Sequence, residues 1–358
     1  MTVDVLFIGA AGHIGAAVLQ ALKTKFPELP VAAIVRSHKD AQHLSDAYNE
    51  NLTVIQGSLE ECELLEAAAS KARLIINCAP DVPYAEGIAA LLRGLASHSS
   101  RAAPRFYIHT SGAARLWDPP NGDVEGRVWD DVADVDSLPA SADATHAPTD
   151  MQVAAAASPS AGVHTAIISP CFVIGRSPSR AHAAPITFPH WMDVVRAVGG
   201  PFTVASGRNV TSFVDTEVLA GLYVRLVEDA LRYVVGGVDA VPDENVWGAR
   251  AYYFASTLEL SMREFNDRYL VPALKRSAAA AWLKKEEATE LSVDEVCKIV
   301  MGRFGDAAEA GLWSRHIAQG FGTSMRTRPT RATKYLGFPF GEGLPGLDAA
   351  VAAMLRKI

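Results

Sequence analysis

Two side chains four residues apart have the types and the spacing needed to move a proton. His146 and Asp150 flank Pro148, and proline favours the first turn of a helix. Residues four apart on a helix lie on the same face, so Asp150 would orient the His146 imidazole and favour its charged form. Because histidine has an ordinary pKa of about 6.5, the pair predicts a general acid–base site. The alternative is that His146 is an ordinary loop residue.

Three glycines spaced three residues apart predict a turn that binds a dinucleotide. They follow the apolar segment 3–8, expected as a strand, and precede the segment 16–25, which has helical composition. The first permits a tight turn, the second lets the backbone approach a pyrophosphate at the helix N-terminus, and the third lets the helix pack against the strand. The residues expected at this turn are Gly9, Gly12, His13, Ile14 and Gly15. Glycines that only form a turn are the alternative.

The end of the second expected strand, 31–35, indicates which dinucleotide binds. An acidic residue there would bind the ribose hydroxyls and repel a 2′-phosphate. The sequence instead has Arg36, Ser37 and Lys39, which could donate to a phosphate. This favours NADP(H) over NAD(H) as the cofactor. The alternative is that Arg36 and Lys39 are solvated surface charges.

Alternating strands and helices would hold these two groups of residues in place. Apolar strands that alternate with helical stretches are typical of βαβ units and of a parallel sheet covered on both faces. We therefore expect an α/β fold, a Rossmann-type doubly wound parallel sheet with a smaller C-terminal substrate-binding region. Strands are expected at 3–8, 31–35, 52–55, 73–77, 105–109, 166–168 and 251–255, and helices at 16–25, 59–72, 88–98, 217–235 and 261–275. Between residues 112 and 148 the periodicity stops, which predicts a long functional or disordered loop.

The same pattern divides the chain into regions. Residues 1–175 are expected to form the NADP-binding Rossmann core, to which elements of residues 210–275 return. Residues 176–209 and 276–345 would form the substrate-binding region, and residues 346–358 a C-terminal helix.

Composition excludes several classes of protein. The chain has 358 residues, 49% of them hydrophobic, and a net charge of −7, which excludes a disordered chain and argues against a nucleic-acid binder. No apolar run reaches the length of a membrane span, and the first residues do not resemble a signal peptide. The four cysteines and ten histidines have no metal-ligand spacing, so no metal is expected. We expect a cytoplasmic monomer or homodimer with reduced thiols.

Several of these stretches together resemble a known superfamily. The spaced glycines, residues 77–80 (Asn-Cys-Ala-Pro) and residues 110–112 (Thr-Ser-Gly) resemble the short-chain dehydrogenase/reductases. Residues 212–215 and 335–339 resemble the extended and atypical branches, and the combination looks most like fungal NmrA-like members. The resemblance covers nearly the whole chain and is strongest over residues 1–112. It implies further cofactor contacts at Leu59, Asn77, Ala79, Pro80, Pro170, Phe172 and Val173.

The resemblance also implies a catalytic set, from which the chain departs. In the superfamily a serine, here Ser111, hydrogen-bonds the substrate carbonyl, and a tyrosine followed four residues later by a lysine donates the proton. No tyrosine here has a lysine at that spacing, and residues 72–274 contain no lysine at all. Our hypothesis is that His146 replaces the tyrosine, with Asp150 as its orienter and Ser111 as the hydrogen-bond donor. Tyr84 is a second candidate proton donor, and a packing tyrosine is the alternative.

Aromatic residues in the less regular regions predict the nature of the substrate. Trp117, Trp191 and Phe213 are expected to cover the ligand crevice, which favours a small hydrophobic substrate. Packing in the core of the smaller region is the alternative for each of them.

Three functions remain open from the sequence. The first is an NADP(H)-dependent oxidoreductase acting on a small hydrophobic carbonyl, imine or alkene, such as a secondary metabolite. The second is a non-redox isomerase, dehydratase or cyclase that uses His146 as its acid–base. The third is an NADP-sensing regulator without catalysis.

Overall fold

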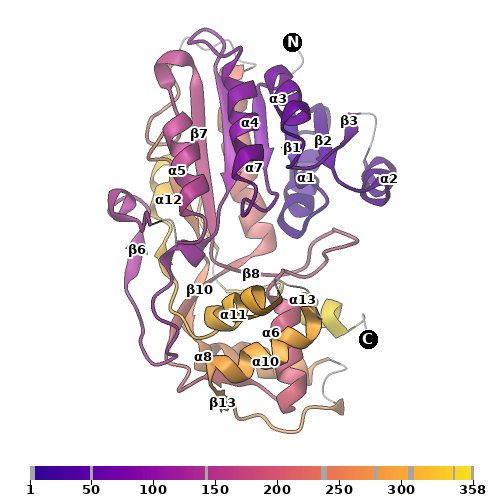
Figure 1. Cartoon of the computed structure of the whole chain (residues 1–358), viewed down its shortest axis with the longest axis vertical. Helices are drawn as coiled ribbons and strands as arrows, with labels where there is room; N and C mark the ends of the chain where they lie inside the picture. Colours follow the sequence, from indigo (N-terminus) through magenta and orange to yellow (C-terminus); the bar gives the residue numbers. More distant parts are fainter. Residues whose placement is uncertain are drawn as a thin grey trace.

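The computed structural model describes residues 5–48, 51–141, 144–234, 240–277, 281–304, 310–341 and 343–355 (Figure 1). The strands are β1 (Val5–Ile8), β2 (Val31–Val35), β3 (Leu52–Gln56), β4 (Leu74–Asn77), β5 (Arg105–Thr110), β6 (Val128–Asp130), β7 (Val163–Pro170), β8 (Phe172–Ile174), β9 (Phe202–Val204), β10 (Val210–Asp215), β11 (Tyr252–Ala255), β12 (Leu258–Ser261), β13 (Thr289–Leu291) and β14 (Arg326–Arg328). The helices are α1 (His13–Lys25), α2 (His38–Ala47), α3 (Cys62–Lys71), α4 (Ala85–Ala96), α5 (Ala147–Ala156), α6 (Phe188–Val198), α7 (Thr216–Val234), α8 (Met262–Phe265), α9 (Val271–Lys275), α10 (Val293–Phe304), α11 (Ala310–Gly320), α12 (Thr330–Leu336) and α13 (Leu347–Leu355).

The largest sheet is parallel and doubly wound. Within the described residues it has seven strands in the order β11-β7-β5-β4-β1-β2-β3, and every neighbouring pair is parallel. The chain runs outward from β1 to β3 and then crosses to β4 on the other side of β1. The predicted Rossmann-type fold is confirmed, and its topological switch point lies between β1 and β4, where such sheets bind ligands.

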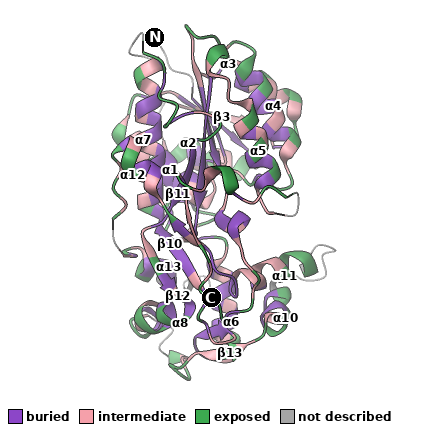
Figure 2. Ribbon diagram, turned by 90° about the vertical axis from the view of Figure 1, so that its left-hand side faces the viewer, coloured by how far each residue is buried: buried purple, intermediate pink, exposed green. Residues whose placement is uncertain are grey.

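Alternating side chains of each strand enter two different layers. Val5 and Phe7 of β1 pack in a cluster with residues of α1, α7 and α12, whereas Leu6 and Ile8 pack with residues of α3 and α4. Successive strand residues point to opposite faces, so an apolar run without polar interruption buries both faces of the sheet. Figure 2 shows the buried strands between two layers of helices.

A second group of elements lies beyond the carboxyl ends of the sheet strands (Figure 1). They include a sheet of β12, β10 and β8, a pair of β13 and β9, and the helices α6, α8, α10, α11 and α13. An aromatic cluster forms the core of this part, with rings 4.7–6.5 Å apart. Its members are Phe172, Trp191, Phe202, Phe213, Phe265 and Phe321. None of the helices in the described ranges is both long enough and apolar enough to cross a membrane.

The structure differs from the predicted elements at particular places. The helix expected at 261–275 begins with a Ser261–Glu264 capping box and continues as α8, a π-helical segment and α9. The irregular stretch 112–148 contains β6, which pairs with β14 about 200 residues later. The start of the first strand and the end of the C-terminal helix lie outside the described residues. The division into domains stays a prediction.

Two helical glycines predict opposite effects on stability. A Cβ at Gly94 of α4 would collide with the backbone oxygen of Glu66 on α3, whereas a Cβ at Gly302 of α10 meets nothing. We expect Gly94→Ala to lower the free energy of unfolding by about 1–3 kcal/mol, because the helices must separate. Gly302→Ala should raise it by about 0.5–1 kcal/mol, since alanine is the better helix former. Denaturant unfolding of both variants measures this, and stabilisation by Gly94→Ala would contradict the close packing.

Candidate functional site

The turn after β1 accepts only glycine at two of its positions. Gly9 has a φ of 81°, and a Cβ there would lie 2.5 Å from the backbone nitrogen of Ala79. A Cβ at Gly15 would collide with the backbone oxygen of Gly9. The turn of residues 9–15, which we call the cofactor turn, therefore packs directly against the turn that follows β4.

The first turn of α1 fits a bound anion. The Gly12 N-cap has no side-chain hydrogen bond, and the first turn contains no acidic residue. A Cβ at Gly12 would meet only Gly9 O, at 3.2 Å, so a ligand can approach this backbone closely. Free N–H groups and the positive end of the helix dipole favour phosphate, so these residues fit the pyrophosphate of a dinucleotide.

The residues after β2 divide into two roles. The Ser37 side chain caps α2 by accepting from Asp40 N at 3.0 Å, and its hydroxyl donates to Asp40 Oδ2 at 2.7 Å. This hydroxyl is therefore committed within the protein, unlike the phosphate donor that the sequence predicted. Arg36 and Lys39 are exposed and remain candidate phosphate ligands.

The other predicted cofactor residues lie at or near the same edge of the sheet. Asn77 is fully buried. Its side-chain N–H donates to Tyr107 OH and its Oδ1 accepts from Ala79 N, so Asn77 stabilises the turn after β4. A Cβ at Gly87 of α4 would collide with the backbone oxygen of Leu59, which places Leu59 beside α4. The remaining residues are Ala79 and Pro80 after β4, Pro170 at the end of β7, and Phe172 and Val173 in β8.

His146 is hydrogen-bonded to a carboxylate that the sequence did not predict. Its Nδ1–H donates to Asp81, with Nδ1 2.8 Å from Oδ1 and 2.9 Å from Oδ2. The predicted pairing of His146 with Asp150 is wrong: His146 is the N-cap of α5, outside the helix, so its ring does not share the helical face of Asp150. Because a carboxylate only accepts, Nδ1 carries the hydrogen and Nε2 is the proton acceptor of the neutral ring.

The charges of this pair stabilise each other. Burial opposes ionisation of Asp81, but the His146 ring and the Thr149 hydroxyl outweigh it and lower the pKa of Asp81 to about 2. Burial likewise opposes the charged form of His146, and Asp81, assisted by Asp150, raises the pKa of His146 above its ordinary value. The partner thus favours the protonated form of an imidazole that can serve as an acid or a base.

The backbone and a neighbouring glycine fix the position of the His146 ring. His146 has φ 71° and ψ −19°, a left-handed conformation that is strained for a residue other than glycine. A Cβ at Gly112 would lie 2.6 Å from His146 Nε2, so the ring packs against the backbone next to Ser111. Strain held in place by surrounding contacts is common at functional sites.

Asp150 belongs to a separate, buried network. Its Oδ2 accepts from Ser111 Oγ at 2.9 Å, Tyr252 OH at 3.0 Å and Arg115 at 3.1 Å. Burial raises the pKa of Asp150 to about 6, while Ser111 and Arg115 oppose the rise. Among the described residues no hydrogen-bond partner reaches Oδ1. The expectation that Ser111 donates to a substrate carbonyl is therefore corrected: its hydroxyl hydrogen goes to Asp150, the stronger acceptor.

Sequence reasoning missed several residues of the site. Asp81 follows β4 by four residues, and a carboxylate just after a parallel strand was the available signal. His109, at the end of β5, is fully buried, and burial lowers its pKa to about 4. His316 of α11 stacks on Trp117 with ring centres 4.5 Å apart. Burial lowers the pKa of His316, and the positive charge of His146 lowers it further. No local pattern marked Arg115, Tyr252 or His316.

The structure separates the predicted aromatic residues. Trp117 is half-buried in the irregular stretch, and its ring stacks on His316 of α11. Trp191 and Phe213 are fully buried in the aromatic cluster, so the expectation that they contact a substrate is corrected. Tyr84 caps α4 and is half-buried against the core, its backbone N–H bonded to Asp81 O.

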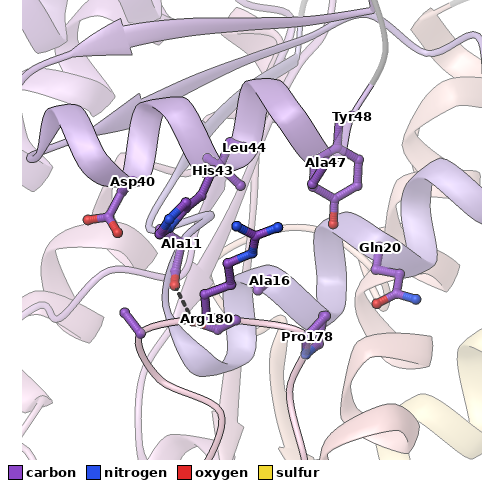
Figure 3. A pocket seen from close by; sticks show the side chains of 12 residues that line it. Ala11, Ala16, Gln20, Asp40, His43, Leu44, Ala47, Tyr48, Pro178 and Arg180 are labelled. Carbon is purple, nitrogen blue, oxygen red and sulfur yellow. Dashed lines mark hydrogen bonds between the residues drawn. The ribbon is translucent and has the colours of Figure 1, made fainter.

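A cavity of about 310 Å³ lies beside the cofactor turn, of which Ala11 lines it (Figure 3). Its walls are α1, α2 and residues 178–181, and its polar lining includes Asp40, His43 and Arg180. Neither His146 nor Ser111 lines it, so it is distinct from the acid–base site.

Comparisons with known proteins agree with this fold. Residues 1–89 match the model of the NmrA-like family. A protein named oxidase ucsJ, from Acremonium sp, is 26% identical over 268 residues, which span 72% of this chain and 75% of that protein. The solved dTDP-glucose 4,6-dehydratase of Streptomyces venezuelae, with NAD bound, has a TM-score of 0.62 at 16% identity, covering 99% and 97% of the two chains. The yeast methylglyoxal/isovaleraldehyde reductase complexed with NADPH has a TM-score of 0.57 at 12% identity, covering 99% and 98%.

These findings confirm the resemblance drawn from the sequence. The two solved structures establish the likeness of fold over nearly the whole chain, and the family match covers the part that contains the cofactor turn. Residues 1–89 therefore match the NmrA-like family, and the fold of nearly the whole chain is like that of the solved dehydratase and reductase.

Proposed function

We propose that the protein is an NADP(H)-dependent oxidoreductase acting on a small hydrophobic carbonyl, imine or alkene, in cytoplasmic secondary metabolism. The observation that carries the proposal is the Asp81–His146 hydrogen bond, formed beyond the carboxyl end of β4. The cofactor turn packs against the residues that lead to Asp81, so a dinucleotide held there would lie beside the acid–base pair. A fungal relative named as an oxidase and a solved reductase of the same fold support redox chemistry.

The protein's own contribution to such a reaction is the proton. A bound nicotinamide dinucleotide would supply or accept the hydride. His146 Nδ1–H is committed to Asp81, so Nε2 is the atom that gives or takes the proton. Asp81 keeps the ring in this tautomer and stabilises the imidazolium that forms when Nε2 is protonated.

Ser111 contributes a hydrogen-bond acceptor. Its hydroxyl hydrogen goes to Asp150, which leaves the oxygen lone pairs of Ser111 for an O–H or N–H of the reacting group. This contact would stabilise the alcohol or amine member of the redox couple. An alcohol has one O–H hydrogen, so for oxidation that hydrogen would turn from the Ser111 oxygen to His146 Nε2, which acts as the general base.

A non-redox isomerase, dehydratase or cyclase is the second candidate. The Asp81–His146 pair is complete as an acid–base without any hydride, which favours this reading. A solved dehydratase and a solved epimerase of this fold, with TM-scores of 0.62 and 0.60, support it.

The first test follows the cofactor and the substrate together. Purified protein is incubated with NADPH or NADP⁺ and with panels of hydrophobic carbonyl, imine, alkene and alcohol compounds, while nicotinamide absorbance and product mass are recorded. We expect cofactor conversion in proportion to product. Product without net cofactor conversion would support the non-redox candidate. Binding of the dinucleotide without conversion of cofactor or substrate would support a sensing regulator.

Removal of the His146 ring should abolish most of the turnover. We expect His146→Ala to lower kcat by about 10²–10⁴, because general acid–base catalysis contributes that much. The matched control is His98→Ala, an exposed histidine after α4, which should leave kcat unchanged. Full turnover in His146→Ala would show that the proton comes from another group.

The pH dependence should follow the Asp81 carboxylate. Asp81 raises the pKa of His146, so the base form needed for alcohol oxidation should form above the ordinary histidine pKa. In Asp81→Asn the raising charge is lost while burial remains, so the acid limb of the kcat/KM profile should move to lower pH, with at least about a tenfold lower plateau. If the acid limb of the kcat/KM profile were unchanged in Asp81→Asn, Asp81 would not control the ionisation on which activity depends.

Arg36 should set the preference for the phosphorylated cofactor. A charge-assisted contact to a 2′-phosphate contributes about 1.5–3 kcal/mol, so Arg36→Ala should weaken NADPH binding by roughly 10- to 100-fold. NADH binding should change little. Nicotinamide fluorescence titrations measure both, with Arg101→Ala, an exposed arginine before β5, as the control. Equal weakening of NADPH and NADH would rule out a phosphate contact.

A further inference from the structure

A segment from the smaller part of the chain is fastened across the cofactor turn. Residues 177–183, which we call the strap, form a closed loop in which Ser177 N–H donates to Ala183 O at 3.0 Å. Ser179 Oγ donates to Ala11 O at 2.6 Å, the bond dashed in Figure 3. His13 Nδ1 lies 2.9 Å from His182 O. The strap thus contacts both the backbone and a side chain of the cofactor turn.

The His13 ring also contacts the start of α7. Its Nε2 lies 3.0 Å from Thr216 Oγ1, and the Thr216 hydroxyl lies 3.1 Å from the backbone oxygen of Ile174, at the end of β8. His13 therefore stands at the centre of a chain that runs from the strap through Thr216 to β8. This side chain is not used by the acid–base chemistry of His146.

Counting hydrogens shows that a neutral His13 cannot complete this chain. His182 O only accepts, so Nδ1 must carry a hydrogen. In the neutral ring Nε2 then has none, and the single hydrogen of Thr216 must go either to Nε2 or to Ile174 O. In the imidazolium both ring nitrogens donate, and Thr216 is free to donate to Ile174 O. Only the charged ring therefore satisfies all three hydrogen bonds.

We propose that His13 is a positioning residue that takes up a proton when the pyrophosphate of a dinucleotide binds, and thereby fastens the strap and Thr216 to the cofactor turn. This inference rests on the proposed dinucleotide site. The anion would bind at the backbone N–H groups of the first turn of α1, and His13 is the first residue of that helix. A negative charge so close to the imidazole favours the charged ring.

The surroundings of His13 allow a large change of protonation on binding. Burial, assisted by the charge of His182 on the strap, lowers the pKa of His13 to about 4, although the bond to His182 O opposes this. On the α7 side the nearest acids along the chain are Asp215, whose oxygens accept from Gly346 N and Glu217 N, and the exposed Glu217. Arg180 adds an exposed positive charge on the strap. Without a ligand the ring is thus neutral at neutral pH.

The direction of the pH effect follows from linkage. If the pKa of His13 is higher in the complex than in the free protein, binding takes up a proton, and affinity falls as pH rises between the two values. The fall is at most about tenfold per pH unit. A dinucleotide that bound without changing His13 would show no such slope.

Proton uptake can be measured with the dinucleotide alone. NAD⁺ and NADP⁺ are titrated into the full-length protein by calorimetry at pH 5.5, 6.5 and 7.5, each in two buffers of different ionisation enthalpy. NAD⁺ is the essential probe, because it lacks the titrating 2′-phosphate. At pH 5.5 we expect the wild type to take up between about half and one proton per dinucleotide, and less as the pH rises.

Three variants assign the proton to His13. His13→Gln keeps an amide donor and acceptor but cannot gain a proton, so its uptake should vanish and its affinity should lose the pH slope. Thr216→Val, which removes the hydroxyl that accepts from the charged ring, should also reduce uptake. His98→Gln is the control, since His98 is exposed after α4 and lies in neither the cofactor turn nor the strap.

The outcomes separate this inference from the proposed function. Wild-type binding without proton uptake, or uptake that survives in His13→Gln, overturns the role of His13 and leaves the dinucleotide site intact. A wild type that binds neither NAD⁺ nor NADP⁺ overturns both. Uptake lost in His13→Gln and retained in His98→Gln supports the inference.

Discussion

The hydrogen bond from His146 to Asp81 is the interaction on which the geometry of the site depends. It joins the turn after β4 to the start of α5, two segments 65 residues apart in the chain. The same ring packs against Gly112, so contacts on two sides of the ring accompany the left-handed backbone at His146. One contact thus fixes a tautomer, a charge and a position.

Asp150 and Arg115 form a buried ion pair at the same edge of the sheet. A buried carboxylate is costly unless it is paired, and the guanidinium, the Tyr252 hydroxyl and Ser111 all point their hydrogens at one oxygen. The pair adds little net charge beside His146, because its two members oppose each other. The electrostatics of the acid–base group are therefore dominated by Asp81.

The fold was predictable because its signals are local, whereas much of the site was not. Apolar strands such as 31–35 and the glycines of the cofactor turn can each be recognised from a few consecutive residues, and both are found where expected. The partner of His146 depends on which strand ends meet, and Asp81 is no closer in sequence than many other carboxylates. The same reason hid the pairing of β6 with β14 and the contact of His316 with Trp117. The prediction that Trp191 and Phe213 contact a substrate was wrong for a different reason. An aromatic residue in an irregular region gives the same sequence signal whether it lines a pocket or packs in a core.

The left-handed backbone at residue 146 restricts which side chains fit there. Glycine tolerates this conformation freely, and asparagine, aspartate and histidine tolerate it better than other residues, whereas a bulky tyrosine is a genuine outlier. A tyrosine at this position would therefore require the start of α5 to change its conformation as well. The conformation of the backbone at residue 146 thus limits which acid–base side chains could occupy this position without a change in the fold.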